Sequence, residues 1–121
     1  MASGHTITIT QADQHVVVTL GGEKLAESDR PVLLDETGLP TRYYLPREDV
    51  RTELLRPTDT ATHCPYKGDA SYYDVIDPHT LQAVDDAVWQ YRTPYPSVDE
   101  ITEYVAFYPE KVQIEVEGPD R

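Results

Sequence analysis

Three stretches of this 121-residue chain combine residue types that could bind a small molecule or react with one. They are residues 30–46, residues 62–73 and residues 89–95. Carboxylates and amines can transfer protons, thiolates and amines can attack electrophilic carbon, and guanidinium and hydroxyl groups can bind oxyanions. These side chains form a site only if the fold brings the three stretches into one pocket.

The candidate catalytic residues are Lys67, Cys64 and Glu36. Lys67 belongs to a predicted hairpin tip, where a lysine is usually a solvated charge. If the hairpin folds over a pocket, Lys67 could bind an anion there, or form a Schiff base if its pKa fell. Cys64 could be a small buried hydrophobic residue, or a nucleophile whose pKa is lowered by neighbouring cations. Glu36 could form a cross-strand ion pair with Arg42, or act as a general acid or base.

The candidate ligand-binding residues are Arg42, Tyr43, Tyr72, Trp89 and Tyr91. Tyrosine, of which the chain has nine, joins an apolar ring to a polar hydroxyl and therefore suits the wall of a pocket. Arg42 and Lys67 are among only 10 basic side chains, against 22 acidic ones. Positive charge placed in an acidic chain favours a small, anionic ligand.

The formal net charge of −12 argues against partners that are themselves anionic. Such a field repels nucleic-acid backbones and anionic lipid surfaces, so we expect neither partner. A single cysteine excludes an internal disulfide and a zinc site built from several thiolates. His5, His15 and His79 lack metal-ligand spacing, so we expect them at the surface and predict no metal and no cofactor. No apolar run is long enough to cross a bilayer, which makes the cytoplasm the default location.

Alternating apolar and polar residues predict strands along most of the chain. These are residues 5–10, 15–20, 24–28, 32–34, 42–45, 60–64, 70–76, 83–92 and 111–117. We predict a mainly β or α+β fold of mostly antiparallel strands, compact and formed as a single domain by residues 1–121. Residues 1–4 are expected to be a loose N-terminal end.

Two short helices are predicted beside these strands. The first covers residues 46–56, with Pro46 in its first turn, and ends at Pro57. The second follows the capping box formed by Ser97 and Glu100, and its buried face should contain residues 101, 104, 105 and 108.

Residue blocks spread over nearly the whole chain form a specific pattern. They are Arg30-Pro31, Glu36-Thr37-Gly38-Leu39-Pro40, Arg42-Tyr43-Tyr44, Cys64-Pro65-Tyr66-Lys67-Gly68, Tyr72-Tyr73, Trp89 with Tyr91, and Tyr104-Val105-Ala106-Phe107-Tyr108. In this order they resemble the bacterial domain-of-unknown-function family 427, which is also labelled a nucleotidyltransferase-like domain. The resemblance implies a β-tent-like fold, similar to small folds of zinc-binding and sulfoxide-reducing proteins. Those relatives bind zinc through pairs of cysteines, which Cys64 alone does not supply.

The residues themselves do not support nucleotidyl transfer. That reaction needs a phosphate-binding loop and two spaced carboxylates that hold divalent metal. Asp85 and Asp86 are adjacent, so a regular strand would send their side chains to opposite faces of the sheet. The sequence also contains no glycine-rich phosphate loop, and no catalytic residue is carried over from the family.

Three hypotheses for function therefore stay open. The leading one is a domain that binds a small, anionic metabolite in a polar, tyrosine-lined pocket, with enzymatic activity undecided. The second is a non-catalytic protein-interaction module or homodimerising domain, in which exposed strand edges pair and the tyrosines form the interface. The third is a thiol-based redox role for Cys64, which requires an exposed thiol of lowered pKa.

Overall fold

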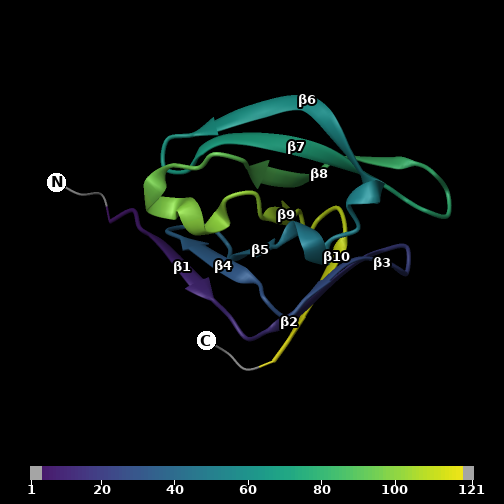
Figure 1. Cartoon of the computed structure of the whole chain (residues 1–121), viewed down its shortest axis with the longest axis horizontal. Coiled ribbons are helices and arrows are strands. Elements are labelled where there is room, and N and C mark those ends of the chain that lie inside the picture. The colour runs from purple at the N-terminus through teal and green to yellow at the C-terminus, as the bar shows by residue number, and fades with distance from the viewer. Residues whose placement is uncertain (1–3, 119–121) are drawn as a thin grey trace.

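The computed structural model describes residues 4–118, which form ten strands in two antiparallel sheets (Figure 1). The larger sheet of this region has the order β1-β4-β5-β9-β8-β7-β6. Its strands are, in that order, Ile7–Gln11, Val32–Glu36, Arg42–Leu45, Val105–Phe107, Ala83–Tyr91, Gly68–Ile76 and Leu55–Cys64. The smaller sheet pairs β10 (Gln113–Glu117), β2 (His15–Leu20) and β3 (Glu23–Ser28). The predicted fold class of mostly antiparallel strands is confirmed. The predicted loose end falls, except for Gly4, outside the described residues.

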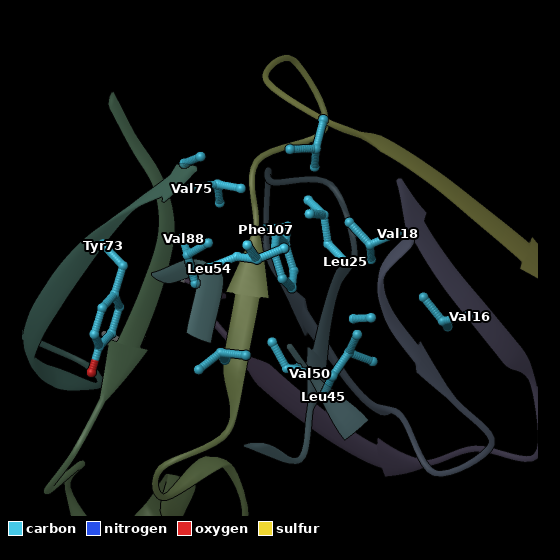
Figure 2. Close-up of a cluster of buried hydrophobic side chains, with 14 residues drawn as sticks. Val16, Val18, Leu25, Leu45, Val50, Leu54, Tyr73, Val75, Val88 and Phe107 are labelled. Carbon is cyan, nitrogen blue, oxygen red and sulfur yellow. The ribbon is translucent and has the colours of Figure 1, made fainter. Parts of the chain in front are cut away.

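The main hydrophobic core lies between the two sheets. Val16 and Val18 of β2 and Leu25 of β3 face Val75, Val88 and Phe107 of the larger sheet (Figure 2). All six side chains are at most 3% exposed. Burying one such side chain contributes about 1.5–3 kcal/mol relative to leaving it in water, so this core couples the two sheets.

A second apolar cluster covers the other face of the larger sheet. Strand alternation places Tyr44 and Trp89 on this face, while their neighbours Leu45 and Val88 enter the main core. The segment after β8 folds over the cluster and inserts Ile101, which is fully buried. The candidate site lies on this second face.

The two predicted helices are much shorter in the structure than the sequence indicated. Residues 46–56 contain two 3-10 turns, η1 (Arg47–Asp49) and η2 (Thr52–Leu54). Between them Val50 bridges to Ala26 of β3. Pro57 does not end a helix but lies inside β6, an edge strand of the larger sheet, where a missing N–H can be tolerated.

The second predicted helix is also a 3-10 segment, η3 (Pro96–Ile101), and the Ser97 side chain does not cap it. The helical face predicted beyond Ile101 is wrong, because Val105–Phe107 forms β9 between β5 and β8. Apolar residues at this spacing suit a buried central strand as well as a helix face, and pairing with two neighbouring strands decides the outcome.

A bulge interrupts the regular alternation of β8 around Asp86. Val84 pairs with Val75 and Val88 with Tyr73, so β8 has two more residues than β7 in this interval. Asp86 takes a left-handed backbone with φ of 47°. Its carboxylate accepts hydrogen bonds from Thr60 and Thr58, which lower the pKa of Asp86. Ala87 and the next residue, Val88, consequently both pack in the main core, which regular alternation would not allow.

The described part of the chain holds no helix long and apolar enough to traverse a bilayer.

Candidate functional site

A tight hairpin between β6 and β7 positions Lys67. Cys64 pairs with Gly68, which leaves a three-residue loop whose last residue is Lys67. Gly68 has a φ of 116°, a conformation that favours glycine. The Tyr95 N–H donates to the Lys67 carbonyl at 3.0 Å, and the Lys67 N–H donates to the Cys64 carbonyl at 3.2 Å. The loop is therefore fixed against the segment that follows β8.

Lys67 is buried at the hairpin tip and forms an ion pair with Glu36 at the end of β4. The Lys67 Nζ lies 2.5 Å from Glu36 Oε1, and the residues are only 8% and 9% exposed. Lys67 therefore differs from the solvated lysine that is usual at a hairpin tip. Within the described residues, the ion pairs of Glu36 are with Lys67 and His5 rather than with Arg42.

His5 lies against this ion pair instead of standing at the surface as expected. Its Nε2 is 3.1 Å from Glu36 Oε2, and its ring stacks on Tyr66 with centroids 3.8 Å apart. Each oxygen of the Glu36 carboxylate thus faces a nitrogen, from Lys67 on one side and His5 on the other. The sequence held no signal for this contact, because His5 lies 31 positions from Glu36 and no motif surrounds it.

Arg42, at the start of β5, presents its guanidinium to two aromatic rings. The Arg42 Cζ lies 5.3 Å from the ring centroid of Trp89 and 5.8 Å from that of Tyr108. These are cation–π distances. No ion pair of Arg42 occurs among residues 4–118. A half-buried guanidinium therefore keeps its N–H donors available beside an aromatic wall.

The tyrosine hydroxyls near Arg42 are held in the protonated form. Burial raises the pKa of Tyr44 and of Tyr91 above the ordinary value of 10.0. Burial, followed by a hydrogen bond with Tyr72, raises the pKa of Tyr108 to about 12. The Trp89 indole N–H donates to the Tyr44 oxygen at 3.0 Å, which leaves the Tyr44 proton for another acceptor. At neutral pH these groups are hydrogen-bond donors rather than bases.

A pocket of about 160 Å³ joins these groups on the second face of the larger sheet. It is lined by Leu34, Glu36, Leu39, Pro40, Arg42, Tyr44, Lys67, Tyr72, Trp89, Tyr91 and Tyr108. The three stretches singled out from the sequence thus contribute to one hollow. Tyr44, Tyr108 and the Leu39–Pro40 loop were not among the candidates, although all of them lie in blocks of the family pattern.

Two candidates do not line this pocket. Tyr43 packs against the main core and lines a separate pocket with Phe107 and Ile114, whereas its neighbour Tyr44 belongs to the second apolar cluster. Cys64 is half-buried and packs against the second apolar cluster, at the base of the hairpin that carries Lys67. Among the described residues, no group of three or more His, Cys, Asp or Glu side chains is arranged to hold a metal ion.

Comparison with curated proteins found no match. The family model described as "Domain of unknown function (DUF427)" matches residues 8–118, which include every strand but the first residue of β1 and every residue of the pocket. The match therefore covers nearly the whole chain, and the protein belongs to the DUF427 family.

Proposed function

We propose that this domain binds a small anionic molecule in the pocket beside Arg42. One observation carries the proposal: the Arg42 guanidinium is half-buried over Trp89 and Tyr108 without a carboxylate partner in the described chain. A planar guanidinium offers paired N–H donors that match a carboxylate or phosphate. The Lys67 charge is already opposed by Glu36, so Arg42 is the group left to attract an anion.

The size and polarity of the pocket support a ligand of few atoms. Pockets for drug-sized ligands measure about 300–1,000 Å³. This one is about 160 Å³. The protonated hydroxyls of Tyr44 and Tyr108 add donors for oxygen atoms, and Trp89 adds an apolar wall. Because the net charge of −12 repels anions, an anionic ligand needs a cation in the pocket to bind it.

The placement of the tyrosines argues for this reading over a tyrosine-mediated dimer. Of the nine tyrosines, all within the described residues, only Tyr66 and Tyr95 are exposed. A flat interface of aromatic side chains would need several of them on the surface. Tyr44, Tyr72, Tyr91 and Tyr108 instead line the pocket.

The test is a thermal-shift and calorimetric titration with phosphate, sulfate, acetate, pyruvate and succinate at constant ionic strength. We expect at least one anion to raise the melting temperature saturably, because a ligand selective for the folded state stabilises it by about 2.7 kcal/mol at 100 times Kd. The Arg42→Gln variant should lose this response. Arg56→Gln, at an exposed arginine of the edge strand β6, should keep it. An equal response in both variants, or no saturable response to any anion, would contradict the proposal.

A further inference from the structure

We infer that Lys67 forms a Schiff base with a small oxo acid whose carboxylate is bound by Arg42. This inference rests on the proposed function, because Arg42 must first hold the anionic end of the molecule. It adds the substrate class, a compound of few atoms carrying both a carbonyl and a carboxylate, and it adds a covalent step.

The surroundings of Lys67 set it apart from the other lysines. The chain has three lysines, and Lys24 and Lys111 are both exposed. Lys67 lines a pocket that also contains an aromatic wall and the Arg42 guanidinium, which forms no ion pair within residues 4–118. A lysine amine in such a site is the nucleophile that condenses with carbonyl compounds. Hydrogen bonds to Tyr95 and Cys64 fix its backbone, and the ion pair with Glu36 holds its amine at the pocket.

Glu36 supplies the proton acceptor that the reaction needs. Its Oε1 lies 2.5 Å from the Lys67 Nζ, within reach for proton transfer. Its second oxygen, Oε2, lies 3.1 Å from His5 Nε2, so Oε1 is the oxygen that faces the Lys67 amine. Proton transfer from the ammonium to Glu36 produces a neutral amine and a neutral carboxylic acid inside the pocket.

The step conserves atoms, charge and electrons. The lone pair of the neutral Lys67 amine forms the N–C bond to the carbonyl carbon, and the carbonyl electron pair moves to oxygen. The nitrogen proton moves to that oxygen, which gives a carbinolamine. The Glu36 acid then returns its proton to the hydroxyl, which leaves as water, and the nitrogen lone pair forms the C=N bond of the iminium. No oxidant or reductant takes part.

The two charged ends of the pocket define the substrate class. The carboxylate of an oxo acid would occupy the N–H donors of Arg42, and the carbonyl would face Lys67. The Tyr44 proton, which the Trp89 N–H leaves available, supports a carbonyl oxygen or a carbinolamine hydroxyl in the same space. A pocket of about 160 Å³ suits molecules of the size of glyoxylate or pyruvate.

The experiment is reductive trapping with cyanoborohydride, followed by intact mass measurement and peptide mapping. The full-length protein is incubated with pyruvate or glyoxylate, and with acetone as a carbonyl compound without a carboxylate. We expect labelling of Lys67 at least about tenfold faster than of Lys24 or Lys111, since a positioned amine gains effective concentration over free ones. Pyruvate should label Lys67, whereas acetone should not show this preference.

Variants distinguish anion binding by Arg42 from the covalent step at Lys67. Arg42→Gln should abolish the preference for Lys67 with pyruvate, while Arg56→Gln should leave it intact. Glu36→Asp, which keeps a carboxylate one methylene further away, should slow labelling of Lys67 by more than labelling of Lys24. Labelling confined to Lys24 and Lys111, or equal at all three lysines, would overturn the Schiff-base inference. If pyruvate then still raised the melting temperature in an Arg42-dependent way, anion binding would stand and only the covalent step would fail.

Discussion

Replacing Lys67 by methionine tests whether the buried ion pair exists as described. The substitution preserves most of the side-chain volume but leaves the Glu36 carboxylate, which is 9% exposed, with His5 as its remaining ion-pair partner. Removing one member of a buried pair destabilises a protein by about 3–5 kcal/mol, because the other charge is left uncompensated. His5 lies 3.1 Å from that carboxylate, so we expect the lower end of this range, about 3 kcal/mol.

Urea unfolding followed by tryptophan fluorescence measures this effect. Trp89 is the only tryptophan and is 6% exposed, so its emission reports loss of the core around the pocket. With a urea slope of about 1.5 kcal/mol per molar, a loss of about 3 kcal/mol moves the midpoint by about 2 M. Lys24→Met is the matched control. Lys24 pairs with Glu27 on the surface, where an ion pair contributes little, so its midpoint should hardly move.

The double variant Lys67→Met/Glu36→Met completes the test. Two apolar residues of similar volume leave no uncompensated charge, so the double variant should be more stable than Lys67→Met alone. A midpoint shift for Lys67→Met no larger than that for Lys24→Met would refute the burial of the pair. Additive effects in the double variant would show that Lys67 and Glu36 do not interact.

Two further predictions concern the tyrosines of the second face. Tyr44→Phe should destabilise the fold by about 1–3 kcal/mol, because the buried Trp89 N–H loses its acceptor. Tyr95→Phe, at an exposed tyrosine, should leave the stability unchanged. An equal loss of stability in both variants would count against the hydrogen bond between Trp89 and Tyr44. Stability should also fall as pH rises above about 10, since the phenols ionise in the unfolded chain first while burial keeps the pKa of Tyr44 and Tyr91 higher in the folded one. Urea midpoints measured from pH 8 to pH 11 check this, and Tyr91→Phe should flatten the decline.

The strands could be predicted because their signals are local. Alternation of apolar and polar residues and turns such as Gly21-Gly22 and Gly38 fix where the chain extends and reverses. The helices failed for a non-local reason. Val105–Phe107 becomes a strand because β5 and β8 both leave hydrogen-bonding groups for it to pair with, and the sequence around Val105 does not contain that information.

The residues of the site could be predicted in part, but their pairing could not. Residue type singled out Glu36, Arg42 and Lys67, and all three line one pocket. Their pairing was not predictable, because Lys67 and Glu36 are 31 positions apart and meet only when the hairpin folds over the end of β4. A cross-strand ion pair between Arg42 and Glu36, which the sequence allowed, does not form in the described chain. The strand register instead places Arg42 opposite Leu34. Glu36 therefore pairs with Lys67 of the hairpin, and Arg42 lies over the aromatic rings.

The buried position of Lys67 at the hairpin tip is not explained by stability. A buried ion pair adds little stability compared with apolar residues of similar volume, because desolvation of the two charges offsets their attraction. Yet the loop that carries Lys67 is held by two backbone hydrogen bonds, and the next residue, Gly68, has a backbone conformation that other residues rarely adopt. Beside this pair, Arg42 is directed at aromatic rings and has no carboxylate partner in the described chain. Apolar residues such as methionine and leucine would stabilise the fold as well, so this arrangement of charges supports the proposal that the pocket binds an anion.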